Sequence, residues 1–135
     1  MEYRVCRNNP APYNDLNGKI SLLGLGTMRL PLRDAADQTS IDEEKAQEIF
    51  DYAYAHGVNY FDTAYPYHGG MSEKFCGKAL AKYPRASYHL ASKLPGWLLK
   101  CDEDVPRIFN EQLANCRTDY FDFYLAHSVH ESSWS

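Results

Sequence analysis

Four short apolar runs recur along this chain at intervals of about thirty residues, and each is followed by a residue able to do chemistry. The runs and the residues that follow them are Leu22–Gly26 with Thr27, Val58–Phe61 with Asp62, Tyr88–Ser92 with Lys93, and Tyr120–Ala126 with His127. A parallel β/α barrel gathers its active site at the carboxyl ends of its strands. The spacing therefore predicts an α/β fold with one active site built from several strand ends.

The length of the chain limits how much of a barrel it can form. A complete (β/α)8 barrel needs about 250 residues, whereas this chain has 135. Residues 1–135 are therefore expected to form a single partial domain, the N-terminal half of a parallel (β/α)8 TIM barrel, which ends after the fourth strand. Two short strands, Tyr3–Cys6 and Lys19–Ser21, flank a turn rich in Asn, Pro and Gly and predict a β-hairpin before the first core strand.

Helical periodicity fills the intervals between the runs. The capping box Ser40–Glu43 predicts that the first helix begins there, and Gly57 is expected to end it. Ser72 is the expected cap of the second helix, and Asp102 or Asp104 that of the third. The residues expected on the buried faces are Ala46, Ile49, Phe50, Ala53 and Tyr54, then Phe75, Ala79 and Leu80, then Val105, Ile108, Phe109, Leu113 and Cys116.

Alternating strands and helices fit two architectures, a doubly wound sheet and a barrel. A doubly wound dinucleotide-binding fold needs G-x-G-x-x-G after its first strand. Gly24 and Gly26 are present, but Arg29 stands at the third glycine position, so that motif fails. Reactive residues at all four strand ends favour the barrel.

Composition and charge exclude several classes of function. The formal net charge is −4, and the Lys and Arg residues are scattered singly, which argues against binding to nucleic acid. No stretch approaches the roughly 20 apolar residues of a membrane span, and the N-terminus lacks the apolar region of a signal peptide, so the expected location is cytoplasmic. The four cysteines form no C-x-x-C pair and the histidines no H-x-x-x-H pair, so no metal site is expected and the thiols are expected to be buried or half-buried.

Asp62, Tyr67, Lys93 and His127 form a set that can reduce a carbonyl group. A carbonyl that accepts hydride from a nicotinamide becomes an alkoxide, and a tyrosine can protonate it if the tyrosine pKa of about 10 is lowered. A nearby lysine ammonium lowers such a pKa, and a carboxylate keeps a buried lysine charged. A neutral histidine can donate a hydrogen bond to the same oxygen. We therefore expect the Tyr67 hydroxyl and the Lys93 ammonium within hydrogen-bond reach or one water of each other.

Each of the four residues also has an ordinary structural interpretation. A single Asp or Lys at a strand end is commonly a cap or a solvated charge, and Tyr67 is one of 11 tyrosines. His127 is in phase with the apolar residues of its strand and suits a buried core position. Their joint occurrence at successive strand ends favours the functional interpretation.

Four segments resemble the aldo-keto reductase family. They are Phe61–Tyr67 with Gly69–Gly70 and Ser72–Glu73, similar to the family's D-T-A-x-x-Y…S-E segment; Leu90–Leu94, similar to its strand that ends in the catalytic lysine; Asp122–His127, similar to its D-x-Y-L-x-H segment; and Leu23–Met28, similar to its first barrel strand. The resemblance spans nearly the whole chain in the right order.

The resemblance implies an oxidoreductase that uses NADPH or NADH to reduce a small aldehyde or ketone. Tyr67 is the implied proton donor, Lys93 its activating cation, Asp62 the partner of Lys93, and His127 the residue that orients the carbonyl. The residues implied to lie beside the nicotinamide are Gly26, Thr27, Met28 and Asp62.

Two further segments extend the resemblance. Tyr67–Gly70 and Lys93–Trp97 resemble a bacterial branch of the family that often carries a C-terminal iron–sulfur module, although no cluster cysteines occur here. Tyr65 and Trp97 are candidates for the substrate pocket, with aromatic packing against the hairpin as the alternative.

Two functions stay open at this point. The first is the catalytic half of a reductase. The second is a non-enzymatic half-barrel that associates with itself or with a partner through its open sheet edges. Barrel phosphate sites usually come from the loops after the seventh and eighth strands, which this chain does not contain, so weak cofactor affinity and self-association are both expected.

Overall fold

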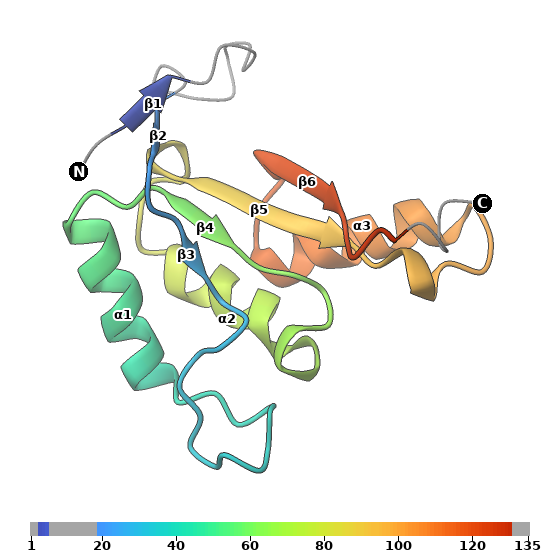
Figure 1. The fold of residues 1–135 in the computed structure, drawn as a ribbon, viewed down its shortest axis with the longest axis horizontal. Coiled ribbons are helices and arrows are strands. Elements are labelled where there is room, and N and C mark those ends of the chain that lie inside the picture. The colour runs from blue at the N-terminus through green and yellow to red at the C-terminus, as the bar shows by residue number, and fades with distance from the viewer. Residues whose placement is uncertain (1–2, 6–18, 131–135) are drawn as a thin grey trace.

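The structure, a computed structural model, describes residues 3–5 and 19–130. Four parallel strands form one sheet in the order β3 (Leu25–Gly26), β4 (Tyr60–Asp62), β5 (His89–Leu94) and β6 (Phe123–Ala126). Three helices lie along one face of this sheet (Figure 1), and they are α1 (Glu43–Ala55), α2 (Met71–Leu80) and α3 (Asp104–Cys116). Three 3-10 turns complete the order, and they are η1 (Tyr67–Gly70), η2 (Arg85–Ser87) and η3 (Gly96–Leu98). The predicted alternation of parallel strands and helices is confirmed.

A two-stranded hairpin lies at the amino ends of the sheet strands. It consists of β1 (Tyr3–Val5) and β2 (Lys19–Ser21), which pair antiparallel as predicted. The Ser21 amide donates to Oδ1 of Asn59 at 2.8 Å, one residue before β4. Cys6 and the turn that follows it lie outside the described residues. The hairpin is thus tied to the end of the sheet opposite the reactive residues.

Side chains along the strands alternate between the face that the helices cover and the opposite face. Phe61 points toward the helices, is fully buried, and stacks on Phe50 of α1 with ring centroids 5.3 Å apart. On the opposite face, Tyr60 packs against Phe123 with ring centroids 5.4 Å apart. The same alternation places Asp62, two residues after Tyr60, on the face without helices.

The helix starts differ from the predicted ones. Asp42 caps α1, because its carboxylate accepts a hydrogen bond from the Lys45 amide. Ser40 lies in the preceding loop, where its hydroxyl donates to the backbone oxygen of Asp37 at 2.7 Å. Gly70, with φ +88°, precedes α2, so Ser72 lies inside the first turn rather than at the cap.

The start of α3 also differs, because neither predicted aspartate occupies the cap. Asp104 is the first helical residue, and its carboxylate accepts hydrogen bonds from the backbone amides of Lys100 and Cys101. Pro106 lies in the first turn, as expected. At the other end of the first helix, Gly57 follows α1 with φ +86°, so the predicted stop is confirmed.

Some apolar residues of the predicted elements are exposed. Leu22 and Leu23 of the first apolar run are 53% and 61% exposed and lie before β3, which has a neighbouring strand on only one side within the described residues. Ile49 on α1 and Val105 on α3 are exposed, whereas Gln112 takes a fully buried position on α3. A polar residue therefore occupies the interior where the periodicity predicts only apolar ones.

The thiols within the described residues fall into two groups. Cys76 and Cys116 are buried and free, whereas Cys101 is exposed, contrary to the expectation for all four cysteines. Burial raises the pKa of Cys76 to about 12. Among the residues that the structure describes, none of the helices has the length and apolar character needed to cross a membrane.

Asp122 organises the amino end of β6. Its side chain is 2% exposed, accepts from the Arg85 guanidinium at 2.6 Å and from the Leu90 amide at 2.8 Å, and lies 3.5 Å from Nδ1 of His89. Arg85 also stacks on the ring of Tyr120, 3.9 Å from its centroid. Burial raises the pKa of Asp122, but hydrogen bonds from His89, the Leu90 amide and Arg85 outweigh burial and leave the pKa below its ordinary value.

We expect Asp122→Asn to lower the free energy of unfolding by about 3 kcal/mol, because it leaves the Arg85 guanidinium without its carboxylate. The pKa of Asp122 is lower in the folded chain than in the unfolded chain, so its stabilising effect is present above pH ~4 and is lost as the pH falls through the folded pKa. Urea unfolding at pH 7 and at pH 3 measures this, and the difference between the two proteins should narrow at pH 3.

The control for this measurement is Asp119→Asn, which changes an exposed aspartate three residues earlier. Its free energy of unfolding should match that of the unchanged chain at both pH values. An equal loss of stability in Asp122→Asn and Asp119→Asn would contradict the assignment.

Candidate active site

Lys93 lies near the carboxyl end of β5, where two oxygen atoms hold its ammonium. Nζ donates to Oδ1 of Asp62 at 2.7 Å and to the backbone oxygen of Thr63 at 2.7 Å. The Lys93 side chain is 13% exposed and the Asp62 side chain 28%, so solvent screens the ion pair only in part. Parallel pairing of β4 and β5 brings the two residues to the same edge of the sheet, as the sequence predicts.

The ring of Tyr67 contacts both Lys93 and His127. Nζ of Lys93 is 4.9 Å from the centroid of the Tyr67 ring, and the imidazole of His127 meets that ring edge-on at 5.8 Å. The structure therefore brings Asp62, Tyr67, Lys93 and His127 together at the strand ends. The contact that the structure gives between Lys93 and Tyr67 is with the face of the ring. Approach of the Lys93 ammonium to the Tyr67 hydroxyl, directly or through one water, stays a prediction.

His127 follows β6 directly, and its pKa lies below the ordinary value for histidine. Burial lowers its pKa, the neighbouring Lys93 ammonium lowers it further, and Asp62 opposes the shift only in part. Within the described part of the chain, Nδ1 of His127 is buried and has no hydrogen-bond partner. A neutral imidazole of this kind can donate a hydrogen bond to a bound carbonyl oxygen.

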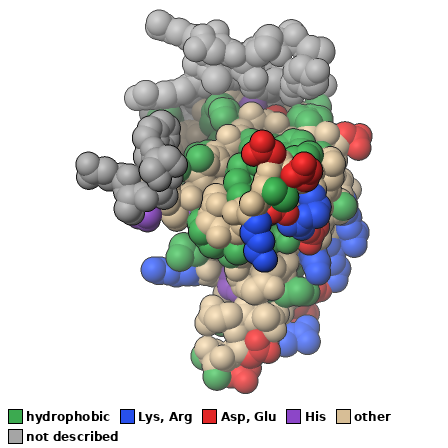
Figure 2. All heavy atoms as spheres, turned by 90° about the vertical axis from the view of Figure 1, so that its right-hand side faces the viewer, with side chains coloured by type: hydrophobic (Ala, Val, Ile, Leu, Met, Phe, Trp, Pro, Cys, Tyr) green, Lys and Arg blue, Asp and Glu red, His purple; other side chains and the backbone are tan. Residues whose placement is uncertain are grey.

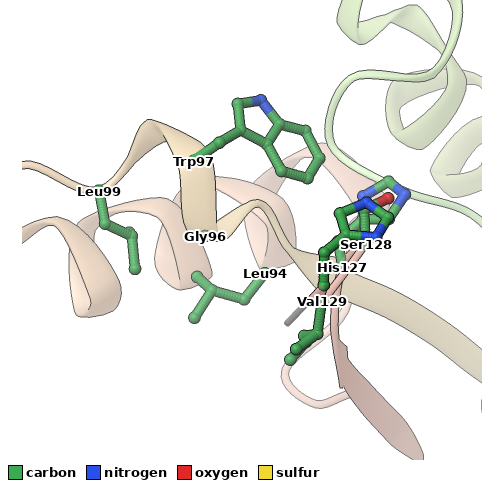
Figure 3. Close-up of a pocket in the computed structure, with 9 residues that line it drawn as sticks. Leu94, Gly96, Trp97, Leu99, His127, Ser128 and Val129 are labelled. Atoms are coloured by element: carbon green, nitrogen blue, oxygen red, sulfur yellow. The ribbon is translucent and has the colours of Figure 1, made fainter. Parts of the chain in front are cut away.

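A pocket of about 470 Å³ adjoins His127. Figure 3 shows Trp97 on the η3 side of the pocket and His127, Ser128 and Val129 on the other side. The Trp97 ring lies 5.0 Å from the imidazole of His127, centroid to centroid, and its side chain is exposed. The pocket is within the size range of small-molecule sites, and Trp97 lines it, as a substrate-pocket residue must.

The other predicted pocket residue, Tyr65, points toward α3. Its hydroxyl donates to Oε2 of Glu111 at 3.1 Å. Tyr65 is absent from the residues that line the pocket beside His127. Its contact with substrate therefore stays a prediction.

Of the three residues Gly26–Met28, which are predicted to meet the nicotinamide, two are exposed to solvent. Gly26 is exposed, and a Cβ added to it would meet no atom within 4 Å. Met28 is 59% exposed. Thr27 is fully buried instead, because its amide and its hydroxyl both donate to the backbone oxygen of Asp62, at 2.9 and 3.0 Å. The Thr27 side chain is therefore directed into the protein interior, where its hydroxyl lies 2.8 Å from that of Ser72.

A buried polar network lies behind Lys93 and was not anticipated from the sequence. Nε2 of Gln112 donates to Oε1 of Glu73 at 2.6 Å and lies 3.1 Å from the backbone oxygen of Lys93, and Ser92 donates to the same Glu73 oxygen at 2.7 Å. Burial raises the pKa of Glu73, and these hydrogen bonds oppose the rise. The sequence does hold one sign of this network: Gln112 lies four residues after Ile108, on the helical face that is otherwise apolar.

The surface around the strand ends carries charges of both signs. Figure 2, which views the side where η3 and the ends of β5 and β6 lie, shows Lys and Arg interspersed with Asp and Glu and with hydrophobic side chains. Within residues 3–5 and 19–130, no group of three His, Cys, Asp or Glu side chains has the arrangement of a metal site.

Comparison with known proteins gives a consistent result. The family model described as Aldo/keto reductase family matches residues 22–133. The L-galactose dehydrogenase of Arabidopsis thaliana is 32% identical over 117 residues, which cover 82% of this chain and 35% of that protein. A thermostable aldo-keto reductase solved with the inhibitor epalrestat is 28% identical, with a TM-score of 0.73, and the match covers 98% of this chain and 44% of that one.

An aldo-keto reductase from Klebsiella pneumoniae, solved in complex with NADPH, is 25% identical with a TM-score of 0.69, and the match covers 97% of this chain and 41% of that one. This chain thus spans about a third of the plant enzyme and less than half of each solved reductase. The structural matches are barrels of which these four units form a part, so the predicted half-barrel is confirmed. The chain belongs to the aldo/keto reductase family.

Proposed function

We propose that this chain is the N-terminal catalytic half of a reductase that uses NADPH or NADH to convert a small aldehyde or ketone to an alcohol. One observation carries the proposal: the Lys93 ammonium, held by Asp62 at 2.7 Å, lies against the ring of Tyr67, which also contacts His127. A phenol, a fixed cation and a neutral imidazole at one strand-end edge are the groups that carbonyl reduction requires.

Each residue of the group has one task in the proposed reaction. His127 lines the pocket, where its imidazole donates a hydrogen bond to the carbonyl oxygen and orients it. Tyr67 donates its phenolic proton to that oxygen as negative charge develops there. The Lys93 ammonium stabilises the phenolate that remains, and Asp62 keeps Lys93 charged and in place.

The residues present fit a nicotinamide at the edge beside β3. Gly26 leaves open space where any side chain would stand, and Met28 is exposed next to it. When bound, the nicotinamide supplies the hydride that reduces the carbonyl carbon. A solved relative from Klebsiella pneumoniae is named as a complex with NADPH, which supports the same class of cofactor for this chain.

We expect Tyr67→Phe to lower kcat for reduction of a simple aldehyde by roughly 10²–10⁴-fold, because it removes the general acid. The dissociation constant for NADPH should hardly change, since the phenol acts mainly in the transition state. The assay uses this chain joined to the C-terminal part of the Klebsiella pneumoniae relative, so that the barrel is complete.

The matched comparison is Tyr65→Phe, which removes a hydroxyl that donates to Glu111 on α3. Its effect on kcat should be far smaller. An unchanged kcat in Tyr67→Phe, with chemistry as the rate-limiting step, would assign the proton to another donor, and a large loss in Tyr65→Phe would identify that residue.

A second candidate function is assembly of two copies into one eight-stranded barrel, and exposed apolar surface at both open edges favours it. Beside β3, a groove of about 420 Å³ has six apolar lining residues, and they are Leu23, Leu25, Ile49, Tyr52, Ala53 and Val58. Beside β6, Tyr124, Leu125 and Val129 are exposed. Pairing β6 of each copy with β3 of the other covers both edges and closes the sheet with two-fold symmetry.

We expect the chain to sediment as a dimer, and Leu125→Lys to shift the population toward monomer because it places a charge on the β6 edge. Val105→Lys is the control, since Val105 is similarly exposed but lies on α3, and its sedimentation should match the unchanged chain. A monomer at all concentrations that binds NADPH would rule out this assembly.

A further inference from the structure

His68 follows Tyr67 directly and adopts an unusual backbone conformation. Its φ and ψ angles are 54° and 41°, and Gly69 and Gly70 continue with φ of 60° and 88°. A histidine in the left-handed region is strained relative to a glycine, so its surroundings must hold it there. The residue is only 6% exposed, and the contacts of its buried side chain hold it in this conformation.

The imidazole of His68 contacts three backbone groups of the segment that follows β3. Nε2 accepts a hydrogen bond from the Leu30 amide at 3.1 Å, and Nδ1 lies 2.9 Å from the backbone oxygen of Gln38. Nε2 is also 3.1 Å from the backbone oxygen of Thr27. A proton on Nδ1 allows two hydrogen bonds, from Leu30 and to Gln38, whereas a proton on Nε2 allows only the one to Thr27. The hydrogen-bond pattern therefore assigns the Nδ1-protonated tautomer.

The segment that His68 holds is continuous with the strand end proposed to meet the nicotinamide. Thr27 and Met28 begin it, and the Thr27 amide is fixed to Asp62 at 2.9 Å. The loop that carries His68 is also seated closely on this segment, since a Cβ at Gly69 would come within 2.7 Å of Cγ2 of Thr39. The imidazole thus crosslinks the loop after β4 to the loop after β3.

We propose that His68 is a positioning residue, which fixes the Tyr67 ring relative to the strand end Gly26–Met28 by clamping Leu30 and Gln38. The catalytic meaning of this placement rests on the proposed reductase function. Among the residues that the structure describes, the ring of Tyr67 contacts Lys93 on β5 and His127 directly after β6, and neither contact reaches the β3 side. The contacts of His68 with Leu30 and Gln38 therefore set the position of the Tyr67 phenol relative to the β3 side of the site.

Two amide substitutions of His68 separate the ring contacts from the backbone strain. In His68→Asn, the side chain tolerates the left-handed conformation and its amide nitrogen takes the place of Nδ1, but it is too short to reach the Leu30 amide. In His68→Gln, the longer side chain brings an acceptor to the place of Nε2, within reach of that amide. His56→Gln is the control, since His56 is an exposed residue at the end of α1.

Two nuclear magnetic resonance measurements on the 135-residue chain report the outcome. Hydrogen exchange of the Leu30 amide should be about tenfold faster in His68→Asn, the equivalent of one lost hydrogen bond, and near its original rate in His68→Gln and His56→Gln. The 13Cζ resonance of Tyr67, assigned by its absence in Tyr67→Phe, should move in His68→Asn and return toward its original position in His68→Gln.

Three results would overturn the proposal. One is a Leu30 exchange rate that does not change in His68→Asn. Another is a Tyr67 resonance that keeps its position although Leu30 exchanges faster, since the clamp would then hold the loop without placing the phenol. The third needs no variant: 15N shifts of the imidazole in the unchanged chain that show a proton on Nε2 rather than Nδ1.

A fluorescence titration with NADPH keeps this test separate from the reductase proposal. If the chain binds NADPH, His68→Asn should weaken binding more than His68→Gln does, because the strand end beside β3 is no longer held. If neither the unchanged chain nor the barrel completed with the C-terminal part of the Klebsiella pneumoniae relative binds NADPH, the reductase proposal loses its support. The exchange and 13Cζ measurements still decide where His68 places Tyr67.

Discussion

The site depends on how the Lys93 ammonium is held. A lysine side chain has four rotatable bonds, and here two acceptors from the neighbouring strand end, the Asp62 carboxylate and the Thr63 backbone oxygen, fix its position at 2.7 Å each. Both acceptors lie within reach of Lys93 because β4 and β5 are parallel and end at the same edge of the sheet. The Tyr67 ring then lies over the ammonium, and its relation to His127 follows from that contact.

Buried polar side chains stabilise the edge of the sheet on which this ion pair stands. The Ser72 hydroxyl lies 2.8 Å from that of Thr27 and 3.0 Å from that of Thr63, and these contacts join β3, β4 and α2. On the other side of Lys93, Gln112 joins α3 to β5. The opposite end of the sheet has its own buried polar network, around Asp122.

The sequence predicted the strand ends well and the helix starts poorly, for physical reasons. Strand order and the meeting of Asp62 with Lys93 follow from the repeat length and parallel pairing. Ser40 and Ser72 fit the rules for helix caps. In the structure Ser40 bonds to the backbone of its own loop instead, and Ser72 bonds to the buried Thr27 hydroxyl. The second of these contacts spans 45 residues and cannot be seen in the local sequence. Gln112 was missed because its burial depends on a hydrogen bond to Glu73, 39 residues away. Membership in the bacterial branch that often carries a C-terminal iron–sulfur module stays a prediction.

We propose that the carboxyl ends of these strands form a nicotinamide-dependent site, and a titration of the 15N-labelled chain with NADPH tests this most directly. Binding of NADPH should shift the backbone resonances of Gly26–Met28, Asp62, Lys93 and His127 and leave those of Arg85 and Asp122, at the opposite end of the sheet, unchanged. Shifts confined to the end around Asp122, or a spectrum that stays the same up to millimolar NADPH, would contradict it.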